Sequence, residues 1–237
     1  MKRFSFLFFF LMSAVPLSSL PGQEFMGSAN FFVGLPQGPF KDNVENAGIG
    51  LTANIGYAPR EVPFMVGLEF GFMNYGTDRR REPFSTTIPD VTVDVESSNN
   101  FALGHLLLRL QPNTGSIRPY LEGAAGFHYL FTSTSIKNLG GEGEEIASST
   151  NLDDIAFSLG GGGGVLIRVW QKDQDDDDEE NPLSAAIIDL RVRYLSGGEA
   201  EYLKEGSIRR ENGRVVYDVK RSQTDLLSVQ IGVSVTF

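Results

Sequence analysis

The sequence predicts an all-β protein: an eight-stranded antiparallel up-and-down β-barrel that crosses a membrane. Apolar residues recur at every second position in eight separate segments, which is the period of a β-strand. These segments are about 10–15 residues long, whereas ordinary globular strands average about 5–6 residues and transmembrane strands need about 9–11. Long and short connections alternate between the segments, as expected for a barrel with long loops at one membrane face and short turns at the other.

The composition excludes several other classes of protein. The chain has 237 residues, of which 41% are hydrophobic, with 2 His and no Cys. Without cysteine it can form no disulfide framework, thiolate zinc site or iron–sulfur cluster, and two histidines leave little room for a histidine-rich metal site. The formal net charge is −10 and there is no basic block, which argues against a nucleic-acid partner. We expect no cofactor, no metal and no nucleic acid.

The first 22 residues have the layout of a secretory signal peptide. Lys2 and Arg3 precede an apolar run from Phe4 to Val15, and small residues and prolines follow. A run of about 12 apolar residues is too short for a membrane-spanning helix, which needs about 20. We expect residues 1–22 to be removed, leaving one β-barrel domain over residues 23–237 in the envelope of a Gram-negative bacterium.

The last segment shows the alternation most clearly. From Leu227 to Phe237 every odd position is apolar, whereas the even positions are Ser, Gln, Gly, Ser and Thr. Small polar side chains suit the narrow interior of a barrel, and an uncharged apolar face would be a poor surface in water. A soluble barrel of the lipocalin type would place its apolar face inside, so the pattern favours the membrane barrel.

The predicted strands follow one another along the chain at residues 25–35, 47–57, 64–75, 101–110, 119–131, 154–170, 184–195 and 227–237. If the first strand starts on the periplasmic side, both termini lie there, with outer loops at 36–46, 76–99, 132–153 and 197–222 and inner turns at 58–63, 111–117 and 171–182. Aromatic residues near strand ends are predicted to form the two interfacial girdles, with Tyr57, Trp170 and Phe237 at the inner one and Tyr75, Tyr129, Phe131 and Tyr194 at the outer one.

On this pattern, residues 25–237 resemble the small eight-stranded outer-membrane barrels of the OmpA/OmpX type, in the porin-like superfamily. The most specific feature is the terminus Val229-x-Ile231-x-Val233-x-Val235-x-Phe237. In that family a terminal aromatic residue, preceded by apolar residues at every second position, is read by the outer-membrane assembly machinery. The resemblance implies this signal for Val233, Val235 and Phe237. It does not imply the cell-wall anchoring of OmpA, because no peptidoglycan-binding domain follows the last strand.

Charged residues on the polar faces would point into the barrel. They are Glu69, His105, Arg109, Glu122, His128, Arg168, Asp189, Arg191 and Arg193. The interior of an eight-stranded barrel is just filled by side chains, and buried charges must be paired or hydrated. We therefore predict an internal ion-pair network that blocks free diffusion, with a gated narrow pore as the alternative.

Two low-complexity runs have competing interpretations. The acidic run contains Asp173, Asp175, Asp177 and Glu179, whose oxygens could bind Ca²⁺. It lacks the central Gly and distant Glu of an EF-hand, so a solvated acidic turn is favoured. Gly160 to Gly164 fits a nucleotide-binding pattern but leads into a strand rather than a helix, which favours a tightly curved barrel strand.

The last outer loop contains a cluster of cations that includes Arg209, Arg210 and Arg214. Asn212-Gly213 within it predicts a hairpin turn. These cations could pair with lipopolysaccharide phosphates, which makes outer-membrane lipid and lipopolysaccharide the expected surroundings.

The leading functional expectation is a monomer in the bacterial outer membrane, without catalysis, that has a structural or surface-interaction role through its outer loops. A narrow channel or small-molecule binder using the charged lumen is the alternative, and a lipid A-modifying enzyme is the third. His128 lies near an outer strand end, with Ser133 and Ser135 after it and Glu122 on its own face. The chain has no Gly-x-Ser-x-Gly elbow, so we expect no enzyme.

Overall fold

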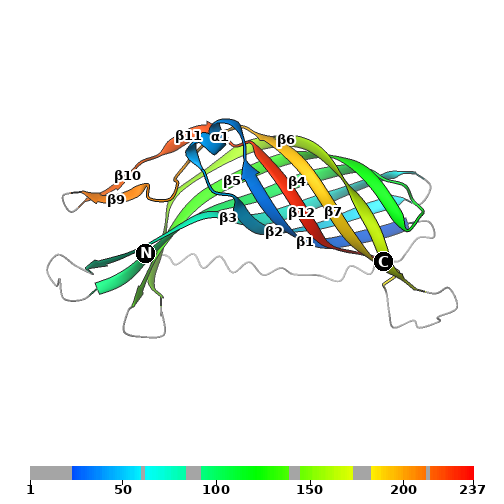
Figure 1. Cartoon of the computed structure of the whole chain (residues 1–237), viewed down its shortest axis with the longest axis horizontal. Coiled ribbons are helices and arrows are strands. Elements are labelled where there is room, and N and C mark those ends of the chain that lie inside the picture. The colour runs from blue at the N-terminus through cyan, green and yellow to red at the C-terminus, as the bar shows by residue number, and fades with distance from the viewer. Residues whose placement is uncertain (1–22, 60–61, 84–91, 139–144, 173–182, 212–213) are drawn as a thin grey trace, which may run out of the picture.

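The computed structural model describes residues 23–59, 62–83, 92–138, 145–172, 183–211 and 214–237. In this part of the chain, eight long antiparallel strands close into a barrel in the order β1-β12-β7-β6-β5-β4-β3-β2 (Figure 1). They are β1 (Gln23–Pro36), β2 (Gly48–Pro59), β3 (Phe64–Pro83), β4 (Thr92–Leu110), β5 (Ile117–Asn138), β6 (Glu145–Gln171), β7 (Ala185–Gly197) and β12 (Leu226–Thr236). Because β1 pairs with both β2 and β12, no barrel edge stays open, and the predicted fold class is confirmed. The predicted signal peptide and acidic run lie outside the described residues.

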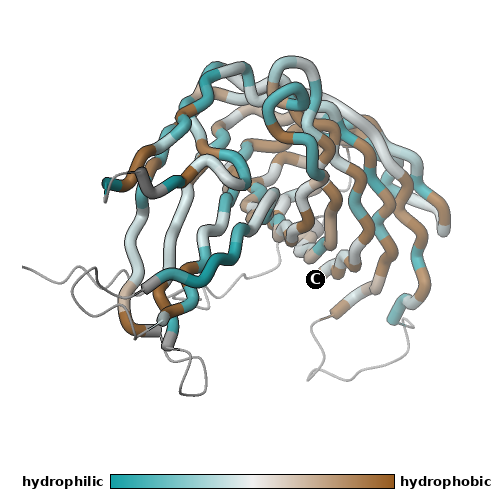
Figure 2. The backbone as a smooth tube through the Cα atoms, turned by 60° about the vertical axis from the view of Figure 1, so that its left-hand side comes forward, coloured by the Kyte–Doolittle hydropathy of each residue, from teal (hydrophilic) through white to brown (hydrophobic). Residues whose placement is uncertain are grey.

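The apolar faces of the barrel strands point outward. In β12 the side chains of Val229, Ile231 and Val233 are 45%, 55% and 54% exposed, whereas Ser228 and Gln230 are buried. Figure 2 shows the resulting alternation of hydrophobic and hydrophilic positions along the barrel strands. Each Å² of apolar surface left in water is unfavourable by about 25 cal/mol. This surface therefore belongs in hydrocarbon, where a closed barrel also satisfies its backbone hydrogen bonds.

Four strands, β3, β4, β5 and β6, continue far beyond the ends that the sequence predicts. The parts of these strands beyond the predicted ends are together called the extension. β3 runs to Pro83 and pairs with β4 from Thr92, while β5 runs to Asn138 and pairs with β6 from Glu145. The prediction of outer loops at 76–99 and 132–153 was therefore wrong over most of their lengths. Apart from the alternating Val93 and Val95 of β4, these polar segments lack an apolar period, and cross-strand partners such as Arg79 opposite Glu96 specify their strands.

The other two predicted outer loops also contain regular structure. Residues 197–222 include two small sheets, one of β8 (Glu199–Tyr202) with β11 (Lys220–Gln223) and one of β9 (Ile208–Glu211) with β10 (Arg214–Tyr217). The β9–β10 hairpin spans the predicted turn, whose residues 212–213 lie outside the described chain. The first outer loop contains α1 (Gly38–Asn43). No helix among the described residues is long and apolar enough to cross a membrane.

The glycine run lies in β6 and leaves room for large lumen side chains. A Cβ on Gly162 would collide with the backbone of β7, and one on Gly164 would lie 2.5 Å from the Tyr120 hydroxyl. The run is thus part of a curved barrel strand, as favoured over a nucleotide-binding loop.

One residue of the predicted outer girdle was placed wrongly. Tyr75 is buried, and its hydroxyl donates to the Leu203 carbonyl at 3.1 Å. Tyr75 is two residues after Met73, which lies on the inward face of β3, so the Tyr75 side chain also points away from lipid. Trp170, Tyr194 and Phe237 remain partly exposed on the outside of the barrel.

Candidate functional site

The central lumen holds a fully buried ion-pair network. Arg191, from β7, donates to Glu69 of β3 at 2.8 Å and to Asp189 at 2.6 Å. Arg193, two residues further along β7, donates to the other oxygen of Glu69. All four side chains are inaccessible to solvent. One carboxylate of β3 is thus held by two guanidinium groups that lie more than 120 residues away in the sequence.

A second group of side chains completes this network. Arg109 donates to Glu122 at 3.1 and 2.9 Å, and its guanidinium lies 4.1 Å from the centre of the Tyr120 ring. The Tyr120 hydroxyl donates to Asp189 at 2.6 Å and accepts from Arg191 at 3.0 Å. Within this network, the guanidinium groups of Arg109, Arg191 and Arg193 balance the carboxylates of Glu69, Glu122 and Asp189, so these six side chains have no net charge.

The structure brings the two predicted histidines together next to this network. The Nε2 atom of His105 lies 3.1 Å from the Ser158 hydroxyl, and that of His128 lies 2.8 Å from the same oxygen. His105 Nδ1 is 3.8 Å from a Glu69 carboxylate oxygen. Sequence reasoning did not single out Ser158, which is distinguished only by lying on the inward face of β6.

Arg168 does not belong to the network, contrary to the prediction. Its guanidinium is partly exposed and donates to the Ser116 hydroxyl at 3.4 Å, at the inner end of the barrel. Ile187, which pairs with Arg168, and Leu166, two residues before Arg168 on β6, are both fully buried. The β6–β7 pairing is also irregular between Arg168 and Trp170. Arg168 therefore occupies an inward-facing position of the strand pattern but is not enclosed by other lumen side chains.

Two apolar layers that the sequence analysis did not foresee close the lumen on either side of the charges. The outer layer includes Phe32, Met73, Phe101, Leu103, Leu130, Leu195 and Leu226, and the inner one comprises Met26, Ala58, Met65, Tyr120, Leu166, Ala185 and Ile187. The available signal was the runs in which consecutive residues are apolar, such as Phe31-Phe32-Val33 and Leu106-Leu107-Leu108. In such runs one side chain must point inward.

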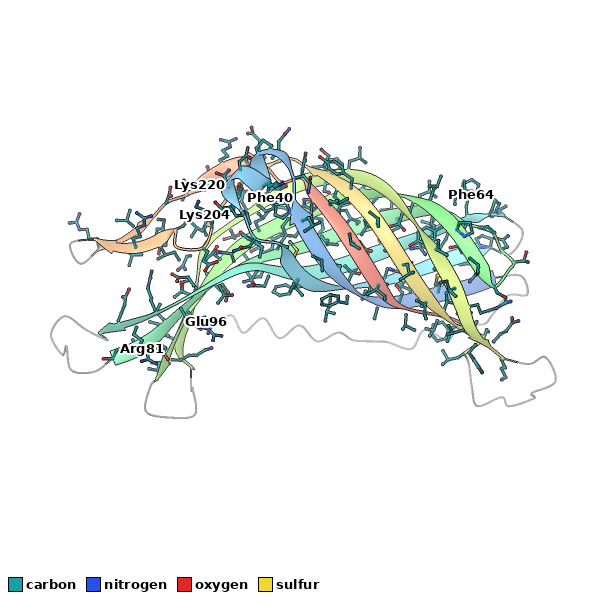
Figure 3. The ribbon with its side chains drawn as sticks, viewed as in Figure 1. Phe40, Phe64, Arg81, Glu96, Lys204 and Lys220 are labelled. Carbon is teal, nitrogen blue, oxygen red and sulfur yellow. The ribbon has the colours of Figure 1, made fainter. Side chains whose placement is uncertain are left out.

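The helix α1 covers the outer mouth of the barrel, where Figure 3 labels Phe40. The buried ring of Phe40 lies 5.1 Å from the Tyr202 ring and 6.0 Å from the Tyr75 ring. Asn43 donates to the Tyr202 hydroxyl at 3.0 Å. The first and last outer loops thus meet in one aromatic cluster, and this cluster extends the outer apolar layer.

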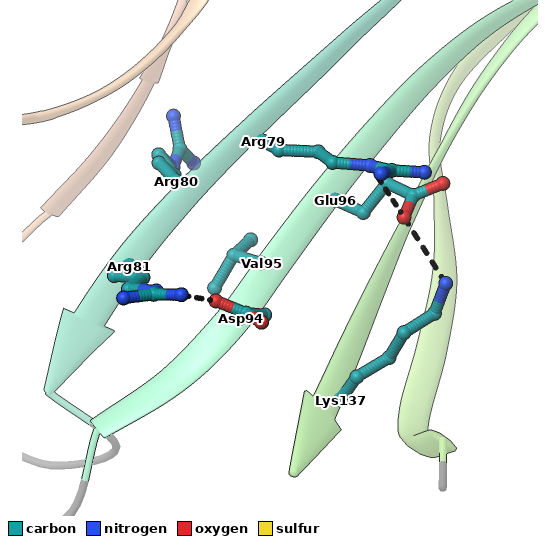
Figure 4. Close-up of a pocket in the computed structure, with 7 residues that line it drawn as sticks. All are labelled: Arg79, Arg80, Arg81, Asp94, Val95, Glu96 and Lys137. Carbon is teal, nitrogen blue, oxygen red and sulfur yellow. Dashed lines mark hydrogen bonds and ion pairs between the residues drawn. The ribbon is translucent and has the colours of Figure 1, made fainter. Parts of the chain in front are cut away.

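One face of the extension carries interstrand ion pairs (Figure 4). Arg79 and Lys137 lie 3.1 and 3.0 Å from Glu96, and Arg81 lies 3.2 Å from Asp94. The hydrogen bond from Lys137 holds the pKa of Glu96 below its usual value. Every cation named here already has a carboxylate partner, so this face is a mixed-charge surface rather than a free anion-binding patch.

A groove lies between the extension and the β9–β10 hairpin. Its volume is about 270 Å³, and it is lined by Arg80, Glu82, Val93, Val95, Thr134, Ile136, Asn151, Ile208, Val215 and Tyr217. Arg80 spans the two parts, because it donates to the Ile208 carbonyl and pairs with Glu82 at 2.9 Å. The groove is lined by both apolar and polar side chains.

These features define the class of protein. A closed eight-stranded barrel with an apolar exterior, short inner turns and long outer elements is a β-barrel of the bacterial outer membrane. The assignment rests on the barrel itself and on the direction of its side chains.

Solved structures of the same architecture are similar to the chain. Neisserial surface protein A is 15% identical, with 91% of this chain and 97% of that one covered and a TM-score of 0.37. Ail, the attachment invasion locus protein of Yersinia pestis, is 11% identical, with coverages of 92% and 100% and a TM-score of 0.37. A major outer membrane protein from Thermus thermophilus is 12% identical, with coverages of 90% and 99% and a TM-score of 0.44. No family model and no curated protein matches the sequence.

Proposed function

We propose that this protein is a closed, non-catalytic barrel that acts at the cell surface through its extension and the β9–β10 hairpin. The observation behind this proposal is the pairing of β3 with β4 as far as Pro83–Thr92, well beyond the apolar belt. A membrane anchor would need only short outer connections. Four extended strands, of which β3, β4 and β5 are joined by specific ion pairs, provide a surface for a partner outside the cell.

The groove supports a protein partner in particular. Val215, Val216 and Tyr217 on β10 are 53%, 43% and 43% exposed, and among the described strands β10 pairs only with β9. An exposed strand edge with apolar side chains is a common way to bind an extended peptide. We expect cells that display the protein to adhere to surfaces or proteins that control cells do not bind.

The test replaces the extension and leaves the barrel intact. Residues 76–99 and 132–153 would each be exchanged for a short turn, and barrel folding checked by heat-modifiable gel mobility. Loss of adhesion from a folded shortened barrel supports the proposal. Unchanged adhesion from that barrel would show that the extension is not the interacting part.

The lumen supports a closed barrel over the alternative of a channel or a small-molecule binder. The neutral ion-pair network fills the centre, and the two apolar layers interrupt any hydrated path through it. Moving an ion through such layers is strongly unfavourable. In planar bilayers we expect no stable conductance, and large steady currents would favour the channel.

We also propose roles for the cationic loop and for the C-terminal strand, as the sequence led us to expect. Arg209 and Arg214 are exposed and available to lipopolysaccharide phosphates, and neutralising both is expected to weaken binding to lipopolysaccharide. Phe237 is half-exposed and its amide donates to the Phe25 carbonyl at 3.0 Å, so the predicted assembly signal closes the barrel seam. We also propose that the barrel is a monomer and that it leaves the lipid profile of the cell unchanged when overexpressed.

A further inference from the structure

Both histidines of the chain point at one buried hydroxyl. The chain has 2 His, and their Nε2 atoms lie 3.1 and 2.8 Å from Ser158 Oγ. His105, His128 and Ser158 come from three different strands, and all are buried. Phe101 covers His128 with ring centres 4.6 Å apart. Three donor atoms of the kinds that bind metals therefore converge inside an enclosed layer of the lumen.

The strand register makes this convergence possible. Gly126 of β5 pairs with His105 on one side and with Ser158 on the other. Any side chain at position 126 would collide with the backbone of Gly104 and His105. The absence of a side chain at Gly126 thus lets His105 and Ser158 meet across the strand between them.

A neighbouring hydroxyl decides which ring nitrogen of His128 carries the proton. Thr224 donates its hydroxyl proton to the Gly198 carbonyl at 3.1 Å, so at 3.3 Å its oxygen can only accept from His128 Nδ1. His128 therefore carries a proton on Nδ1 and, when its ring is neutral, turns the Nε2 lone pair toward Ser158. The Nδ1 atom of His105 lies 3.8 Å from a Glu69 carboxylate oxygen, which is beyond hydrogen-bond distance. His105 also directs its Nε2 atom at the Ser158 hydroxyl.

With the proton of His105 also on Nδ1, beside the Glu69 carboxylate, both Nε2 lone pairs point at Ser158 and one of them has no donor. Ser158 has a single hydroxyl proton and can donate it to only one of the two Nε2 atoms. A buried acceptor without a donor is unfavourable by about 1–3 kcal/mol. A cation that accepts both lone pairs would satisfy His105, His128 and the serine oxygen together.

We propose that His105, His128 and Ser158 form a binding site for a divalent transition-metal ion, with Zn²⁺ the best match. Neutral imidazole is a preferred ligand of Zn²⁺ and Cu²⁺, and a carboxylate on the far ring nitrogen, as Glu69 is here, commonly orients such a ligand. Among the described residues no three His, Cys, Asp or Glu side chains are grouped to hold a metal. The site depends on a hydroxyl as its third donor. It departs from the absence of metal expected from the sequence.

The test uses the full mature chain without an affinity tag, refolded from denaturant into detergent with and without Zn²⁺. Refolding admits the ion before the lumen closes. After desalting, we expect one zinc per folded wild-type chain by mass spectrometry and close to none in His105→Gln or His128→Gln. With Cu²⁺ in place of Zn²⁺, electron paramagnetic resonance should show coupling to two nitrogens.

A gain-of-ligand variant keeps the test valid if the glutamine variants fold poorly. Ser158→Cys places a thiolate at the point of convergence, and we expect at least about tenfold tighter zinc binding because thiolate is the stronger ligand. The chain has no other cysteine. The proposal is overturned if folded wild-type protein takes up no zinc, if both glutamine variants retain it, or if Ser158→Cys binds no more tightly. If the folded protein binds no metal and one of the two imidazoles titrates, a proton shared between the histidines and Ser158 occupies the site instead of a metal ion.

Discussion

Replacing Glu69 with glutamine tests whether the lumen network stabilises the barrel. The substitution keeps the size of the side chain and removes its charge. Glu69 accepts from Arg191 at 2.8 Å and also from Arg193, and all three side chains are inaccessible to solvent. Without this carboxylate, three buried guanidinium groups would face only two carboxylates, those of Glu122 and Asp189.

The expected loss of stability follows from this imbalance. Breaking a buried ion pair by removing one partner is unfavourable by about 3–5 kcal/mol, because it leaves an uncompensated buried charge. That corresponds to a decrease of between about 10²- and 10⁴-fold in the folding equilibrium. Equilibrium urea unfolding in lipid vesicles, followed by the fluorescence of Trp170, the single tryptophan, measures the difference.

An exposed pair provides the matched control. Arg81 and Asp94 lie 3.2 Å apart but have 72% and 45% of their side-chain surfaces exposed, so Arg81→Gln should lower stability by no more than about 1 kcal/mol. Adding Arg193→Met to Glu69→Gln restores the charge balance and should recover part of the loss. If Glu69→Gln alone destabilises the barrel no more than Arg81→Gln does, the network does not stabilise the fold.

Three further substitutions test other parts of the structure. Phe40→Ala removes a ring buried at the outer mouth and should lower the free energy of unfolding by about 3–5 kcal/mol, with urea unfolding as the measurement and an unchanged midpoint as the contrary result. Gly162→Val should prevent folding because its side chain would collide with β7, whereas at the outward-facing Gly161 an alanine should be accepted, both judged by heat-modifiable mobility. The hydrogen bond from Lys137 lowers the pKa of Glu96 from 4.5, so this contact stabilises the extension above that pH and is lost as the pH falls through the lowered value. Limited proteolysis of the extension should therefore accelerate in acid, and a Glu96→Gln variant with the same acid response would exclude this cause.

The barrel could be predicted because its signal is local. In β12 the polarity of each residue indicates whether it faces lipid or lumen. Val229 faces outward and Ser228 faces the lumen, as the alternation predicts. The extension could not be predicted in this way. Most of its residues, such as Arg79 and Glu96, are polar, and only Val93 and Val95 give a short apolar period. The pairing of these segments depends on the barrel that brings β3 and β4 together.

The lumen was predictable as a list of residues but not as an arrangement. The inward direction of Glu69, Arg191 and Arg193 follows from period 2, yet alternation also placed Arg168 inside, whereas its guanidinium is partly exposed at the inner end of the barrel. Whether an inward residue joins the network depends on its height along the barrel axis. That height is set by the stagger of all eight strands, which no single segment contains.

The sequence by itself determined that eight strands would close into a barrel with a hydrocarbon-facing exterior, because the choice between lipid and lumen is made residue by residue. The tertiary structure alone decided which inward side chains meet. Glu69 and Arg191 are 122 positions apart, and His105 reaches Ser158 only across Gly126. Such contacts exist only once the ring has closed in one register, since closure converts positions on separate strands into neighbours within a shared, water-poor interior.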